Sequence, residues 1–200
     1  MMVLKTRSIG TLFDSFAQSV ERMSETRGNY MAGLGLDMAI SAVLSFEGLR
    51  RTEGRLAEAC LTLLCGLLLF TLVEYCFHRW LFHGSVPFLE PGHRRHHDNP
   101  QGYDSMPFFL APIGVLALTG LFMALLPMNY ALLLAGGLSA GYATYGLSHC
   151  VIHYMRFRHP VARRWAASHH IHHHHPDKNF GVTTPLWDIL LGTRYVSTRK

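Results

Sequence analysis

Charged side chains are scarce in this sequence, and one long stretch has none at all. Asp, Glu, Lys and Arg together make up 16% of the 200 residues, against about 25% in a typical soluble domain. Residues 105–155 are 51 consecutive positions without any of the four. A soluble surface or a disordered segment of that length normally carries charge. The scarcity therefore argues against both an ordinary soluble enzyme and a disordered chain.

Cysteine is also sparse, and its spacing suits neither disulfides nor zinc. The four cysteines lie in or beside apolar runs and form no CxxC pair: Cys60, Cys65, Cys76 and Cys150. A disulfide framework or a zinc knuckle requires paired or clustered spacing. We therefore interpret these residues as small apolar packing residues.

Long apolar segments are present instead. A helix that spans a bilayer takes about 20 mostly apolar residues, and four segments meet or approach this requirement: 30–49, 56–77, 106–126 and 130–150. Pro127 separates the last two, and the first is the weakest because it contains Asp37 and Glu47. The pattern predicts an all-α, multi-pass membrane protein with about four transmembrane helices.

The distribution of basic residues indicates how these helices are oriented. With four spans, 15 of the 18 Lys and Arg residues lie on one side of the membrane, whereas three spans split them 11 to 7. The positive-inside rule therefore favours four spans with both termini in the cytoplasm. Residues 1–29 lack the apolar core of a signal peptide, so we expect a cytoplasmic segment there, followed by one membrane domain at 30–200. The formal charge of +5 suits a membrane surface, and no nucleic-acid partner is expected.

Histidine, by contrast, is unusually frequent, at 14 of 200 residues. All but one of the histidines fall into four groups, which are His78 and His83; His93, His96 and His97; His149 and His153; and the run at 169–175. An even number of expected spans separates these groups, so all four emerge on one face of the membrane. That face carries most of the basic residues, so we expect a helical cytoplasmic cap that holds the histidines.

Spacing within the groups adds to this prediction. Residues three or four apart share one face of a helix, and such pairs occur in the second, third and fourth groups. His78 and His83 are five apart and diverge on a straight α-helix. The helix must end or bulge between them if both side chains bind one centre.

The number of histidines indicates more than one metal ion. Neutral imidazole is a good ligand for iron, zinc, copper and nickel. One ion cannot use ten imidazoles, but two ions with about five each can. A pH sensor needs few histidines and no fixed spacing. The pattern therefore predicts a two-metal site.

The four motifs together resemble the fatty acid hydroxylase superfamily, which includes sterol desaturases and C4-methyl oxidases. The shared pattern is HxxxxH, HxxHH, HxxxH and HxxHH, and the likeness runs from His78 to about Thr193. Residues 180–188 (FGVTTPLWD) and 191–193 (LGT) are most similar to the fatty acid 2-hydroxylase branch.

The resemblance implies two metal ions that are held by histidines alone. One ion is expected to be bound by His78, His83, His93, His97 and His173, and the other by His96, His149, His153, His170 and His174. The last motif has a second possible register, because His169-x2-His172-His173 also reads as HxxHH. We choose His170 as its start because the family commonly has two successive histidines there, of which the second begins the motif. The remaining histidines of the run then orient the ligands or face solvent: His169, His172 and His175.

Carboxylates near the motifs are candidates for orienting the imidazoles. Three are close in sequence: Glu74, one turn before His78, Asp98, next to His97, and Asp177, just after the last motif. For Glu74 a second interpretation is open, because a buried acid can instead pair with a nearby Arg.

The resemblance also implies a reaction. It is O2-dependent hydroxylation of the acyl chain of a fatty acid or membrane lipid, with two iron ions as the cofactor and O2 as co-substrate. The same ligands can hold zinc in a purified sample. Residues 1–30 show no haem motif, so we expect electrons from an external donor, a ferredoxin or a cytochrome b5-like protein.

Two alternatives are open from the sequence. A sterol or carotenoid hydroxylase, or a desaturase, of the same superfamily uses the same ligands, because substrate choice lies in the cavity. A histidine-rich divalent-metal transporter is the rival from another class. Transporters place ionisable groups near mid-membrane, and only Asp37 lies well inside an expected span. We therefore favour an enzyme.

Overall fold

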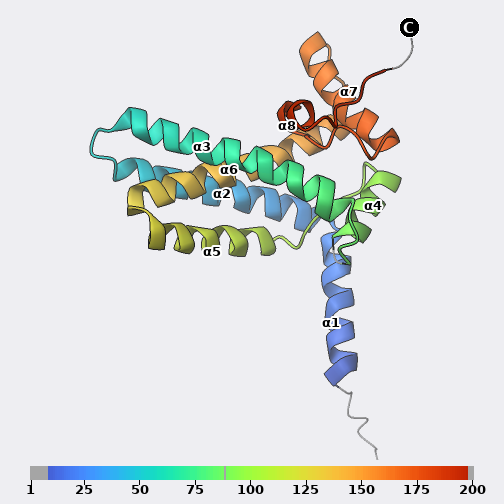
Figure 1. The fold of residues 1–200 in the computed structure, drawn as a ribbon. Helices are drawn as coiled ribbons and strands as arrows, with labels where there is room; N and C mark the ends of the chain where they lie inside the picture. The colour runs from blue at the N-terminus through green and yellow to red at the C-terminus, as the bar shows by residue number, and fades with distance from the viewer. Residues whose placement is uncertain (1–8, 88, 198–200) are drawn as a thin grey trace, which may run out of the picture.

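The computed structural model describes residues 9–87 and 89–197, and within them the regular structure is entirely helical (Figure 1). The elements are α1 (Ile9–Ser24), α2 (Arg27–Arg50), α3 (Leu56–Cys76), η1 (Phe77–Phe82), α4 (Glu90–Asp98), α5 (Leu110–Leu125), α6 (Met128–Tyr154), α7 (Pro160–His174) and α8 (Leu186–Leu190). The all-α prediction is confirmed for these residues. Each of the four apolar segments expected from the sequence overlaps one of the long helices α2, α3, α5 and α6.

These four helices run side by side, and α6 lies at the centre of the bundle (Figure 1). The sequence of α6 explains its place, because it buries mainly small residues: Ala131, Ala135, Gly136, Gly137, Ser139, Gly141 and Ala143. Small side chains allow neighbouring helix backbones to approach closely, as they do in membrane proteins. The large apolar side chains of the other three helices therefore pack around α6 or face outwards.

The tightest approach is between α3 and α6. A Cβ atom added at Gly137 would lie 2.2 Å from the carbonyl oxygen of Leu63, and one added at Gly66 would lie 2.3 Å from that of Leu134. Each glycine thus makes room for the backbone of the opposite helix, and neither position tolerates a side chain without a shift of the backbone.

We expect Gly137→Ala to destabilise the bundle by about 1–3 kcal/mol, the usual effect of overpacking a well-filled interior. Thermal unfolding in detergent measures this change. Gly114→Ala on α5 is the control, because a Cβ there meets nothing within 4 Å and alanine favours helix more than glycine does. Equal unfolding temperatures for the wild type and Gly137→Ala would contradict the close backbone contact.

The outer surface of the bundle is strongly apolar. Large side chains on α3 and α5 are exposed, including Leu61, Leu64, Leu68, Ile113, Leu116 and Leu121. Within the described residues, α2 and the continuous stretch of α3 and η1 are long and apolar enough to cross a membrane, and α5 is apolar but shorter. Exposed apolar area of this extent is rare on soluble monomers and suits a lipid environment.

The short helices gather at one end of the bundle (Figure 1). Helices α4, α7 and α8 lie where η1 and α6 end, and the α2–α3 and α5–α6 turns lie at the opposite end. Helix α1 projects from the same end as the short helices. The histidine motifs are on η1, α4, the last turns of α6 and α7, so the fold brings them together there.

Candidate metal centre

A π-helical turn brings the first two histidines to the same side of their helix. The α3 helix widens into η1, where the His83 N–H donates to the His78 carbonyl oxygen at 3.2 Å, an i→i+5 bond. The two imidazole rings stack with their centroids 5.2 Å apart. The bulge expected between these residues is therefore present, and it matches their five-residue spacing.

Five imidazoles converge in the first histidine group, which consists of His78, His83, His93, His97 and His172. The Nε2 atom of His93 lies 3.1 Å from that of His78 and 3.0 Å from that of His83. The Nε2 atoms of His83 and His172 are 3.0 Å apart. All five rings thus direct ring nitrogens at a common point.

A second histidine group lies beside the first and contains His96, His149, His153 and His169. His173 adjoins it, because its Nε2 lies 3.2 Å from the Nε2 atoms of both His96 and His169. The groups are neighbours, since the rings of His97 and His173 stack with centroids 4.4 Å apart. The four motifs therefore form two adjacent clusters of imidazoles.

The hydrogen bonds of two rings show which nitrogen faces the centre of the first group. His172 Nδ1 donates to the Lys178 carbonyl oxygen at 2.7 Å, and His78 Nδ1 donates to that of Phe180 at 2.5 Å. In a neutral imidazole the other nitrogen then carries only a lone pair, so Nε2 of both rings presents a lone pair to its neighbours. Lone pairs that converge at this distance fit a bound cation, and an all-imidazole set suits a transition metal.

The environment keeps these imidazoles in the form that binds metal. Burial lowers the pKa of His83 to about 4 and the pKa values of His96 and His172 to about 3, from an ordinary value near 6.5. For His96, repulsion between the charged forms of neighbouring histidines adds to this effect. All three rings are therefore neutral at pH 7, as ligation requires.

In the last motif the structure gathers the histidines of the second register, which starts at His169, rather than those of the register chosen from the sequence. His170 and His174 are exposed and lie outside both groups, whereas His169 and His172 are 1% and 0% exposed. The buried face of α7 causes this difference. Ala166 packs there against Ile152 and Val182. His169, three residues later, shares its face, and His172 in turn lies three residues after His169.

The other expected ligands do lie in the clusters. The structure brings together eight of the ten: His78, His83, His93, His96, His97, His149, His153 and His173. In the register that starts at His169, His172 would take the place expected for His173, His169 that of His170, and His173 that of His174. His175 lies away from both groups and stacks on Tyr195 with ring centroids 4.6 Å apart.

The carboxylate of Glu74 forms hydrogen bonds with backbone N–H groups rather than with an imidazole ring. It accepts hydrogen bonds from the backbone N–H groups of Val182 and Thr183 at 2.6 and 2.9 Å, and from the Thr183 hydroxyl. Within the part of the chain that the structure describes, Glu74 has no hydrogen bond or ion pair with a histidine ring or an Arg, so neither role expected for it is found there. Asp98 and Asp177 also make no hydrogen bond to an imidazole among the described residues.

Asp188 forms hydrogen bonds with the two residues that precede Val182. The sequence analysis did not predict this role. Its side chain is buried and accepts from the N–H groups of Phe180 and Gly181, both at 2.8 Å, and from the Thr193 hydroxyl at 2.7 Å. Together, Glu74 and Asp188 fix the Phe180 carbonyl that accepts from His78. The FGVTTPLWD segment was the available signal, but its spacing alone does not reveal which atoms it presents.

A cavity of about 920 Å³ adjoins the clusters. It begins at His93, His96 and His149 and extends into the bundle to Asp37 on α2 and Tyr142 on α6. Its walls come from α1, α2, α4, α6 and the first turn of α5, from Phe82 at the end of η1 and from the segments before α4 and α5. A long apolar molecule can therefore enter the bundle with one part beside the histidines.

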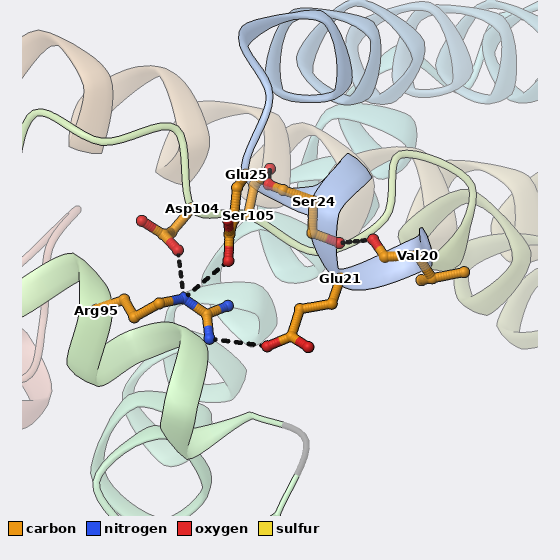
Figure 2. Close-up of polar contacts among 7 residues, drawn as sticks. All are labelled: Val20, Glu21, Ser24, Glu25, Arg95, Asp104 and Ser105. Atoms are coloured by element: carbon orange, nitrogen blue, oxygen red, sulfur yellow. Dashed lines mark hydrogen bonds and ion pairs between the residues drawn. The ribbon is translucent and has the colours of Figure 1, made fainter. Parts of the chain in front are cut away.

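Helix α1 forms one wall of this cavity and is tied to α4 by ion pairs (Figure 2). The Arg95 Nε lies 2.9 Å from Asp104 Oδ1 and 3.3 Å from Glu25 Oε1, and its Nη1 lies 3.2 Å from Glu21 Oε1. Arg95 also lies between histidines of both groups along α4. One guanidinium thus joins α1, α4 and the segment before α5.

Arg95→Gln is expected to loosen α1. Loss of an ion-pair network at a partly exposed site costs about 1 kcal/mol, which corresponds to roughly five-fold faster cleavage of the opened segment. Trypsin digestion after Arg22 and Arg27, followed by mass spectrometry, measures the rate. Arg94→Gln is the control, because the Arg94 side chain is 66% exposed and, among the described residues, pairs only with Glu90 of its own helix. Equal cleavage of the two variants would contradict the tether.

Comparison with known proteins reveals similar chains. The model of the fatty acid hydroxylase family matches residues 63–193. The fatty acid 2-hydroxylase of Rattus norvegicus is 32% identical over 148 residues, which cover 64% of this chain and 38% of that protein. The ceramide very long chain fatty acid hydroxylase SCS7 of Saccharomyces cerevisiae is 32% identical over 151 residues, which cover 68% of this chain and 38% of that protein.

A solved structure is similar over most of the fold. Full-length scs7p, with only its hydroxylase domain visible, matches with a TM-score of 0.76 at 26% identity, over 90% of this chain and 71% of that one. The matched regions cover between 38% and 58% of the length of the curated relatives.

Proposed function

Because the chain belongs to the fatty acid hydroxylase family, we propose that it is a membrane oxidoreductase that hydroxylates the acyl chain of a lipid. One observation carries the proposal: two clusters of neutral imidazoles, with converging lone pairs, open onto a cavity of about 920 Å³. The matched relatives include fatty acid 2-hydroxylases, and we extend their position of attack, C2, to this chain.

Two iron ions are the proposed cofactor. The first histidine group would hold one ion, and the second group together with His173 would hold the other. When bound, iron supplies the reduction of O2 and the oxidation of an unactivated C–H bond, which no side-chain acid, base or nucleophile can carry out. An imidazole set holds zinc as well, so the metal is to be identified in the purified protein.

The residues of the chain perform the remaining tasks. The carbonyl groups of Phe180 and Lys178 orient two of the imidazoles through Nδ1, which keeps Nε2 free. The cavity wall made by α1 and α2 excludes water from the reacting carbon and aligns the alkyl chain beside the histidines. The protein thus positions the substrate and excludes water, while the metal and O2 supply the redox chemistry.

We further propose four membrane crossings, made by α2, α3 with η1, α5 and α6, with the histidines in a cap on the cytoplasmic side. The apolar outer surface of the bundle supports this arrangement, as does the excess of basic residues on the side of the cap. Substrate then reaches the cavity from the bilayer.

Electrons are proposed to come from an external ferredoxin or cytochrome b5-like protein. Four exposed arginines lie on and just before α7, next to the second histidine group: Arg156, Arg158, Arg163 and Arg164. A basic surface close to the metal centre favours association with an acidic donor. Donor binding should therefore weaken as salt concentration rises.

Incubation of membranes with 18O2, a reductant and candidate lipids tests the reaction. Mass spectrometry should find one labelled oxygen atom in a 2-hydroxyacyl product. A new double bond without label would instead make the protein a desaturase, and label only in a sterol or carotenoid would assign it to that branch of the superfamily. Absence of all these products with a reduced donor present would overturn the proposed function.

A further inference from the structure

An acidic side chain lies at the inner end of the cavity, and its carboxyl group has no partner among the residues that the structure describes. Asp37 is only 7% exposed and lines the cavity. Its backbone carbonyl accepts from the Ser139 hydroxyl, but its carboxyl group makes no hydrogen bond or ion pair with any described residue. A buried carboxyl group without a partner is costly, so its retention in an apolar bundle points to a ligand.

Asn29, another buried polar side chain in the cavity wall, differs in this respect. Asn29 Nδ2 donates to the Ser105 hydroxyl and the Met106 carbonyl oxygen, both at 2.9 Å. Its Oδ1 accepts from the Phe108 N–H at 2.9 Å. The hydrogen bonds of Asn29 are therefore satisfied within the protein, whereas the Asp37 carboxyl group is available to a molecule in the cavity.

A second unpaired polar group accompanies Asp37. The Tyr142 hydroxyl makes no hydrogen bond with any described residue, although its ring packs edge-on against Phe70 at 5.8 Å and stacks on Tyr145 at 6.3 Å. Ser139, one turn before Tyr142 on α6, donates to the Asp37 carbonyl oxygen, so this part of α6 packs against Asp37, and Asp37 and Tyr142 both line the cavity. The inner end thus offers one carboxyl group and one hydroxyl.

The position of Asp37 and Tyr142 sets the distance between the inner end of the cavity and the histidines. Tyr142 and His149 are seven residues apart on α6 and both line the cavity, which corresponds to about 10 Å along a helix. A chain that places one carbon beside the histidines therefore has another point, about 10 Å away, beside Asp37 and Tyr142.

We propose that Asp37 and Tyr142 form a subsite for a hydroxyl group on the alkyl part of the lipid substrate. A hydroxyl can donate to the carboxylate and accept from the phenol at the same time. An ammonium group cannot accept, and a carbonyl group cannot donate. The substrate class is therefore an acyl lipid that already carries one hydroxyl, about 10 Å from the carbon that is oxidised. The inference rests on the proposed function and names its substrate.

Positional isomers of a hydroxyacyl lipid test the subsite. The hydroxyl is moved along the chain one carbon at a time, and each isomer is compared with the unsubstituted lipid by kcat/KM and by displacement of a fluorescent acyl probe. The wild type should prefer one isomer by about 10- to 100-fold, the effect of a hydrogen bond to a charged group. In Asp37→Leu this ratio should fall close to one, and Tyr142→Phe should lower it less.

Controls separate failure of the subsite from failure of the reaction. If Asp37→Leu does not fold, Asp37→Asn replaces it; this variant keeps one acceptor and should retain part of the preference. Met38→Leu changes an exposed neighbour (52% exposed) and should leave the preference unchanged. Equal kcat/KM and equal probe displacement for all isomers in the wild type would overturn the subsite while leaving the reaction in place. If no lipid is oxidised, probe displacement alone decides, and equal displacement again overturns the subsite.

Discussion

Replacing His172 with Ala should abolish hydroxylation and lower the bound metal, whereas the same change at His174 should leave both close to wild type. His172 is fully buried, and its Nε2 lies 3.0 Å from that of His83 at the centre of the first group. Loss of a group that merely orients a ligand typically costs 10- to 100-fold, so loss of the ligand itself should exceed about 100-fold in activity. Labelled product and metal per protein are the two measurements.

His169 and His170 provide a second matched pair. His169 is buried, with its Nε2 3.0 Å from that of His153, and His170 is exposed. His169→Ala should therefore behave as His172→Ala does, and His170→Ala should behave as the wild type. Retention of metal by His172→Ala together with its loss in His174→Ala would restore the register expected from the sequence.

The sequence predicts those parts of the fold for which a single physical property, such as the absence of charge, determines the structure. Absence of charge marks the long helices, and Pro127 marks the turn between α5 and α6. The continuation of α6 to Tyr154 was less readable, because its last turns contain polar residues. The position of α1 against the cavity depends on Arg95, whose carboxylate partners are far away in sequence.

The site was predictable as far as spacing determines it. Three- and four-residue intervals place side chains on one helix face, and the five-residue interval of His78 and His83 required the bulge that η1 supplies. In the run at 169–175, more than one set of histidines has the spacing of the motif. Spacing alone therefore could not identify which of them lie in the clusters. The choice depends on packing, namely the burial of Ala166 against Val182, which involves residues outside the motif.

Glu74 and Asp188, the carboxylates that hold the backbone of residues 180–183, show the same limit. The second large prediction concerns Asp188. Asp188→Asn should destabilise the protein by about 3 kcal/mol and release metal. Both carboxylate oxygens of Asp188 accept from backbone, one from the N–H of Phe180 and the other from that of Gly181. An amide has only one acceptor atom, so either orientation of Asn leaves one buried N–H facing another donor.

Glu74→Gln is the contrasting change, although the two carboxylates look equivalent in the sequence. Both N–H groups held by Glu74 donate to the same oxygen, Oε1, while Oε2 faces the Thr183 hydroxyl. A hydroxyl can turn from donor to acceptor, so Gln keeps every contact and should cost less than about 1 kcal/mol. Thermal unfolding with metal analysis compares the variants. Similar losses in both would mean that the negative charge of the carboxylates matters rather than their acceptor geometry.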